Sequence, residues 1–106
     1  MNTYRPRRSA QRWLEGAPEY VLACADNRGK TADRYEVLFA GSLWDPSMGR
    51  RIQCLGMSGA PTHPQGFSQW GECPASYRPT SRDKVRWLDL PEHIRAHVKA
   101  RAERQY

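Results

Sequence analysis

Three runs of apolar residues in the first half of the chain have the length and spacing of β-strands. Residues 19–26 are apolar on both alternating sets of positions, which is typical of a strand buried on both faces. Residues 34–40 alternate between two sides, and residues 50–57 form a third run. Asn27 and Gly29 lie between the first two runs and tolerate positive φ, so the pattern predicts an antiparallel hairpin there.

Two further segments carry helical signals. An Asp-x-x-Glu capping-box spacing begins at Asp89, and it contains a proline suited to a first helical turn. Apolar side chains then recur at helical spacing, which predicts a helix over about residues 90–103 whose apolar face covers the sheet. Near the other end, Ser9 is a candidate N-cap and Gly16 a candidate stop, so a short helix is predicted between them.

These elements predict an α+β fold. A three- or four-stranded antiparallel sheet is built mainly from residues 19–57, with residues 84–88 as a possible edge strand, and the C-terminal helix packs on one face. A chain of 106 residues fits one domain. We therefore predict a flexible basic arm over residues 1–8 and a single domain over residues 9–106.

Residues 56–74, GMSGAPTHPQGFSQWGECP, match neither a helical nor a strand pattern. Phe67 and Trp70 are costly to leave in water, and the three prolines of this stretch reduce the entropy lost on ordering. We predict a long ordered loop that Phe67 and Trp70 pin against the sheet, closing one end of the core. A functional alternative is that the loop is a recognition surface held on a rigid scaffold.

The formal charge of +6 is unevenly distributed. Residues 1–15 and 75–106 are basic, whereas residues 16–48 are mildly acidic. Most of the cations are arginines, which pair well with phosphate and carboxylate groups. A basic balance fits a polyanionic partner such as nucleic acid, and it equally fits a soluble, arginine-rich surface.

The cysteines give no sign of a disulfide framework. Cys24, Cys54 and Cys73 are widely spaced and form no CxxC motif. The first 20 residues contain no apolar run that would serve as a signal peptide, and no stretch is apolar enough to span a bilayer. We therefore predict a cytoplasmic protein with reduced thiols.

Candidate reactive and metal-binding side chains lack a supporting signature. His93 and His97 are four residues apart, a spacing that can chelate zinc, but no close cysteine pair accompanies them. Whether these histidines bind zinc together with a cysteine is left open. A cysteine could also be combined with His63 and Asp33 into a catalytic triad, yet no local signature surrounds any of the cysteines. The sequence thus predicts no catalytic residue, no cofactor and no enzyme.

Three strings, YVLACADNRGKTADRYEVLF, LGMSGAPTHPQGFSQWGE and WLDLPEHIRAHV, cover about three quarters of the chain. Together they resemble a family of small accessory proteins encoded by tailed phages and prophages. The resemblance implies a phage or prophage origin, and it does not imply an enzyme. The matching residues are Asp26, Asn27, Gly29, Lys30, Thr31, Asp33, Arg34, Tyr35, Gly56, Met57, Ser58, His63, Pro64, Gln65, Gly66, Phe67 and Gln69.

We therefore predict a non-catalytic phage or prophage protein that binds a host protein or nucleoprotein complex in the cytoplasm. An inhibitor of host defence, such as an anti-CRISPR protein, is one form that this would take. Tryptophan and arginine are the usual interface anchors. The residues predicted to contact the partner are Arg7, Arg8, Trp44, Arg50, Arg51, Trp70, Arg82 and Arg86.

The alternative is weak, sequence-tolerant binding of nucleic acid. Aromatic residues lie among the arginines, and this composition suits stacking on bases. The aromatic candidates are Tyr4, Trp13, Tyr77 and Trp87. The chain has no helix-turn-helix or zinc-finger pattern, so this binding would depend strongly on salt. The pattern leaves the oligomeric state open.

Overall fold

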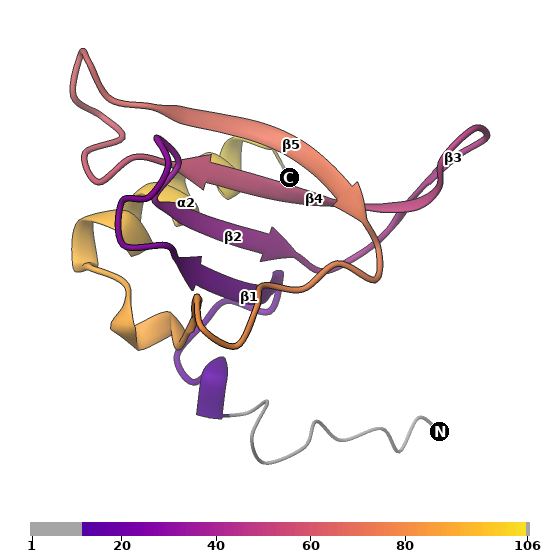
Figure 1. Cartoon of the computed structure of the whole chain (residues 1–106), viewed down its shortest axis with the longest axis horizontal. Coiled ribbons are helices and arrows are strands. Elements are labelled where there is room, and N and C mark those ends of the chain that lie inside the picture. Colours follow the sequence, from indigo (N-terminus) through magenta and orange to yellow (C-terminus); the bar gives the residue numbers. More distant parts are fainter. Residues whose placement is uncertain (1–11, 106) are drawn as a thin grey trace.

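The computed structural model describes residues 12–105 of the chain. Its fold is α+β, as predicted, with an antiparallel sheet and one long C-terminal helix (Figure 1). In chain order the elements are β1 (Val21–Asp26), β2 (Tyr35–Phe39), β3 (Leu43–Asp45), β4 (Gly49–Met57), β5 (Ser68–Pro74), β6 (Lys84–Val85), the short 3₁₀ helix η1 (Trp87–Asp89) and α2 (Glu92–Gln105).

The strands form one antiparallel sheet in which β4 is the longest member. The order β3-β4-β2-β1-β6 describes the main path, and β5 pairs with β4 in addition. β4 pairs with three other strands. Its first three residues pair with β3 and its second half with β2, while β5 pairs with residues 51–57. The β2–β3–β4 segment is therefore a long hairpin whose far end extends beyond the rest of the sheet (Figure 1).

The strand number exceeds the prediction of three or four, because the described part of the chain contains six. The sequence analysis missed β3 and β5. It expected residues 84–88 to be a possible edge strand, and Lys84–Val85 do pair with β1 before the chain turns into η1. The predicted short N-terminal helix is not seen as an element. Arg12 and Trp13 have helical conformation, but residues 9–11 and the predicted arm lie outside the described residues.

The glycine- and proline-rich stretch is ordered but is only partly a loop. Met57 ends β4 and Ser68 begins β5, so the loop proper covers residues 58–67. The Ser58 N–H donates to the Phe67 carbonyl at 2.9 Å, and the Phe67 N–H donates to the Ser58 hydroxyl at 2.9 Å. These bonds close the loop on itself, so it is the connection of a β4–β5 hairpin.

Helix α2 fastens this loop to the rest of the molecule. Nε2 of His93 donates to the Gly59 carbonyl at 2.7 Å, and a hydrogen bond of 2.8 Å joins Nε2 of His97 to the hydroxyl of Ser68. Burial and the nearby Arg101 lower the pKa of His97. Both histidines thus hold the loop and the start of β5 in place.

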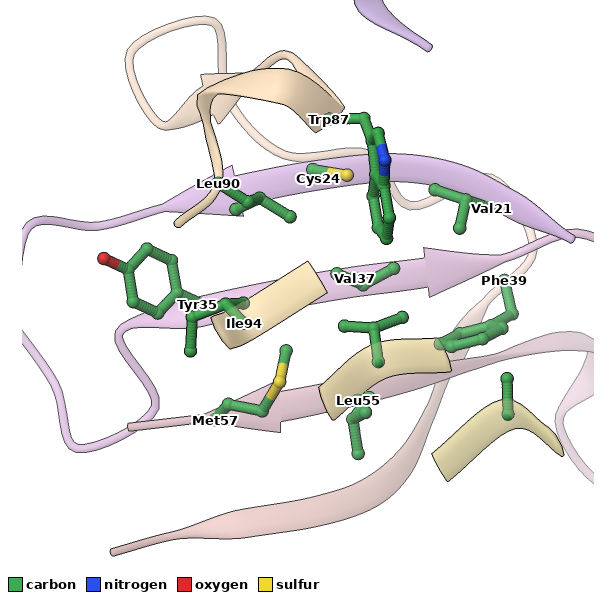
Figure 2. Close-up of a cluster of buried hydrophobic side chains, with 12 residues drawn as sticks. Val21, Cys24, Tyr35, Val37, Phe39, Leu55, Met57, Trp87, Leu90 and Ile94 are labelled. Atoms are coloured by element: carbon green, nitrogen blue, oxygen red, sulfur yellow. The ribbon is translucent and has the colours of Figure 1, made fainter. Parts of the chain in front are cut away.

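The main core lies between the sheet and α2. Figure 2 shows side chains of β1, β2 and β4 directed toward the helix, with Trp87 beside them. Ile94 and Val98 of α2 are fully buried there, as the helical spacing predicted. Phe39 stacks on Tyr20, with ring centroids 5.7 Å apart. The predicted packing of the helix on one face of the sheet is confirmed.

The opposite face of the sheet carries smaller side chains. Its buried cluster consists of Ala23, Leu38, Ile52 and Cys54. The segment between β5 and β6 crosses this face (Figure 1), and the Tyr77 hydroxyl donates to the Glu36 carboxylate at 3.2 Å. An irregular segment, and not a helix, therefore covers this face.

Candidate functional site

The β3–β4 hairpin brings together residues that the sequence analysis proposed separately. Trp44 lies directly opposite Arg50 in the register, and Leu43 lies opposite Arg51. Paired residues of an antiparallel sheet point to the same face, so Trp44 and Arg50 share one face of the hairpin and Leu43 lies on the other. This hairpin is the far end of the molecule in Figure 1.

The turn of the hairpin is held by one carboxylate. Oδ1 of Asp45 accepts the Ser47 N–H at 2.8 Å, the Ser47 hydroxyl at 2.7 Å and the Met48 N–H at 3.0 Å. The hydroxyl bond from Ser47, together with these N–H groups, lowers the pKa of Asp45. Gly49 follows at φ +80, a conformation that favours glycine. The tip is therefore preorganised by its own side chains.

Large apolar side chains at this tip face solvent. Leu43 is 48% exposed, Trp44 70% and Met48 62%. Large apolar side chains that gather in one exposed region mark interaction sites, and here Leu43 and Trp44 lie on opposite faces of one short hairpin. The sequence analysis missed Leu43 and Met48. The Asp-Pro-Ser-Met-Gly turn sequence between two short extended segments is the signal that could have identified them.

The two arginines of the hairpin have different surroundings. Arg50 is exposed, and its guanidinium donates to the Ser42 hydroxyl at 3.2 Å. The Arg51 side chain is only 13% exposed, donates to the Glu72 carbonyl at 3.2 Å and lies 4.0 Å from the Glu72 carboxylate. Arg50 is therefore available to a partner, whereas Arg51 anchors the hairpin to β5.

Trp70 lies apart from the hairpin tip. It is half-buried, and its ring packs on Phe39 with centroids 5.0 Å apart. The Arg101 guanidinium lies over the Trp70 ring, 6.0 Å from its centroid. The half-buried ring closes the edge of the core, as the loop prediction had it, and its predicted contact with a partner stays a prediction.

Arg82 and Arg86 lie near the opposite edge of the sheet, beside β6. Arg86 is bound by Asp89 through two contacts, of 3.0 and 2.8 Å, which raise the pKa of Arg86 and lower that of Asp89. Arg82 is exposed, and its carbonyl accepts a bond from Arg28. The structure thus separates these two arginines from the hairpin, while Arg7 and Arg8 lie outside the described residues.

A cation-rich hollow of about 310 Å³ lies at this second edge. It is lined by Arg12, Trp13, Lys84, Arg86 and Asp89. The Lys84 ammonium lies 4.7 Å from the centroid of the Trp13 ring. Trp87, another proposed stacking residue, is 1% exposed and belongs to the core. The predicted surface of arginines and aromatic rings is therefore smaller than expected, and Tyr4 lies outside the described residues.

The remaining candidate chemistry finds little support in the described residues. Among residues 12–105 no group of three or more histidine, cysteine or acidic side chains could hold a metal ion. Nδ1 of His63 accepts the Gln65 N–H at 3.0 Å, a contact within the loop. In the same part of the chain, no helix is long and apolar enough to cross a membrane.

A polar hollow of about 280 Å³ lies where the β5–β6 segment crosses the sheet. Burial raises the pKa of Glu36, and burial with the nearby Glu36 raises the pKa of Tyr77 to about 12. Asp33 and Asp83 also line this hollow. The arrangement ties the covering segment to the sheet.

Comparisons with protein-family models, with curated proteins and with solved structures find no match to this chain.

Proposed function

We propose that this chain is a non-catalytic binding protein that seats the tip of its β3–β4 hairpin in an apolar recess of a host protein. The observation that supports this proposal is the exposure of Leu43, Trp44 and Met48 on a hairpin that extends beyond the sheet. The resemblance to small phage accessory proteins gives the setting, a bacterial cytoplasm, and inhibition of a host defence complex is one form of the activity.

The side chains of the tip indicate which groups the surface of the partner should carry. Burying an apolar side chain of this size contributes about 1.5–3 kcal/mol when burial is complete, so the three side chains of the tip can supply part of the binding free energy. Tryptophan and arginine side by side are typical of the residues that dominate interface energies. Arg50 shares a face with Trp44, so the recess should carry a carboxylate at its rim.

Capture of partners from a bacterial lysate tests this proposal. The immobilised chain is compared with Trp44→Ala and with the control Leu88→Ala, which removes another exposed apolar side chain, on η1 at the other edge of the sheet. We expect a discrete protein to bind the original chain and Leu88→Ala after nuclease treatment, and Trp44→Ala to lose it. Equal capture by all three chains would exclude the tip as the contact.

Nucleic-acid binding is the second candidate, and the hollow that contains Trp13 and Lys84 favours it. Arg86 is paired with Asp89 in this hollow, and Arg12 and Lys84 are the two other cations that line it and could contact phosphates. Fluorescence anisotropy with generic DNA and RNA should therefore give a salt slope that corresponds to about two or three neutralised phosphates, a weaker dependence than the sequence alone led us to expect. A steeper slope with tight binding would favour this function over the first.

A further inference from the structure

Two thiols from neighbouring strands meet on the face of the sheet opposite α2. In the β4–β5 register Cys54 lies opposite Gly71 and Ile52 lies opposite Cys73, so the two cysteines are diagonal neighbours on one face. The Cys73 thiol donates to Sγ of Cys54 at 3.2 Å. Both are free thiols, and neither belongs to the hairpin tip.

We propose that Cys54 and Cys73 form a reversible disulfide site whose oxidant is a small-molecule disulfide of the glutathione class. The sulfur atoms need to approach each other by only about 1 Å to reach the length of a disulfide bond. The paired strands already hold the two side chains together on one face of the sheet. Gly71 leaves room beside Cys54, since a Cβ at that glycine would lie 3.6 Å from Sγ.

The two thiols differ in access, and this sets the order of reaction. Cys54 is 9% exposed, and burial together with the adjacent Cys73 raises its pKa to about 12. Cys73 lies on the edge strand β5 and is only half-buried. Cys73 is therefore the thiol that meets an oxidant first, and Cys54 is the resolving thiol.

The exchange balances as two successive displacements. The Cys73 thiolate attacks one sulfur of glutathione disulfide, so a mixed disulfide forms and one glutathione thiolate leaves. Cys54 then gives up its proton to solvent and attacks Sγ of Cys73, which releases the second glutathione as a thiolate. Two protein thiols are oxidised, one glutathione disulfide is reduced, and both released thiolates take up protons according to pH.

Cys24 provides an internal comparison. It is 1% exposed and lies in the cluster on the α2 side of the sheet, and burial raises its pKa to about 12. Cys54 and Cys73 belong to the opposite face. Cys24 is therefore expected to remain reduced in the folded chain. Its modification would show that the chain had unfolded during the reaction.

The disulfide would enclose the loop of residues 58–67 by joining β4 to β5. Cross-links that close loops of about 20 residues stabilise a protein chiefly by restricting its unfolded chain. For a domain of this size the midpoint of thermal unfolding should rise by about 5–15 °C on oxidation. Addition of dithiothreitol should reverse the rise.

The test treats the full chain with oxidised glutathione, blocks the remaining thiols with iodoacetamide and measures intact and peptide masses. We expect the original chain and Cys24→Ala to gain a Cys54–Cys73 disulfide without bound glutathione. Cys54→Ala should stop with one glutathione on Cys73, and Cys73→Ala should remain unmodified. These results would be independent of the function proposed for the hairpin.

Other outcomes would overturn the site. A chain that stays reduced, or that keeps glutathione on Cys73 just as Cys54→Ala does, would show that the second displacement does not occur. A disulfide that includes Cys24 would show that the reaction needs unfolding. If a variant fails to fold, the original chain alone tests the site. A reversible rise of its unfolding midpoint, together with the peptide mass of the Cys54–Cys73 disulfide, would support the site, and the absence of either would overturn it.

Discussion

Gly66 occupies a point in the β4–β5 loop where no side chain fits. A Cβ at this glycine would collide with the Ala60 carbonyl oxygen, which is backbone and cannot move aside. The N–H of Gly66 also donates to the His63 carbonyl at 2.7 Å. A single backbone position therefore decides how tightly this loop can close.

Gly66→Ala should destabilise the fold by about 2–4 kcal/mol, because the loop must open to admit the methyl group. Gly59→Ala is the matched control, since a Cβ at Gly59 would meet nothing within 4 Å. Urea unfolding of both variants measures the free energies of unfolding. Equal effects for the two glycines would mean that the loop is not packed as described.

Glu36 is a carboxyl group whose burial raises its pKa. A folded-state pKa above the unfolded value means that the folded state holds the proton more tightly. The protonated carboxyl group therefore contributes to the free energy of unfolding at low pH. This contribution is lost as the pH rises from the ordinary pKa of 4.5 through the raised pKa of the folded state. At neutral pH the charged carboxylate therefore weakens the fold.

Glu36→Gln removes this charge but keeps an acceptor for the Tyr77 hydroxyl. The variant should be more stable than the original chain by about 0.5–1 kcal/mol at neutral pH, and the difference should vanish below a pH of about 4. Urea unfolding at two pH values measures it, with the exposed Glu19→Gln as control. If Glu36→Gln were more stable than the original chain at low pH but not at neutral pH, the raised pKa of Glu36 would be contradicted.

Among the elements, those with strong internal patterns could be predicted from the sequence. β1, β2 and β4 have apolar runs, and α2 has capping and spacing signals, so each was found near its true bounds. β5 alternates only weakly and contains Gly71 and Pro74, so its pairing with β4, and not its own pattern, makes it a strand. β3 has three residues, too few for a pattern.

The candidate site could also be predicted only in part, because it depends on which strands pair with each other. Trp44 and Arg50 were proposed individually as contact residues, but only the register of β3 with β4 places them opposite each other. The loop composition predicted that Trp70 packs against the sheet, but it did not identify the side chains that Trp70 meets there. Burial of a ring depends on its neighbours in space, here Phe39 and Arg101, which are distant in the chain.

The packing of α2 on the sheet should account for much of the stability. Ile94→Ala removes a fully buried side chain and should cost about 3 kcal/mol. Leu43→Ala shortens an aliphatic side chain at the exposed tip and should change the free energy of unfolding by less than about 0.5 kcal/mol. Urea unfolding compares the two. A large loss for Leu43→Ala would mean that the tip supports the fold.

At the scale of the whole molecule, the exposed apolar side chains of the hairpin tip and the cation-rich hollow beside β6 lie at opposite edges of the sheet. Beside β6, Arg86 is paired with Asp89 and Arg28 with Asp83, whereas Lys84 lies against the Trp13 ring. The hairpin tip combines exposed apolar side chains with Arg50, and its own carboxylate, Asp45, is used in the turn. This distribution supports the proposal that the tip makes the contact with a partner.

Site-specific photo-crosslinking in bacterial cells tests the role of the tip most directly. A photoreactive amino acid replaces Met48 in one chain and Leu88 in another, both exposed in the isolated protein. We expect the probe at position 48 to form a discrete adduct with one host protein and the probe at position 88 to form none. Adducts from position 88 alone, or only nucleic-acid adducts from either position, would contradict binding through the hairpin.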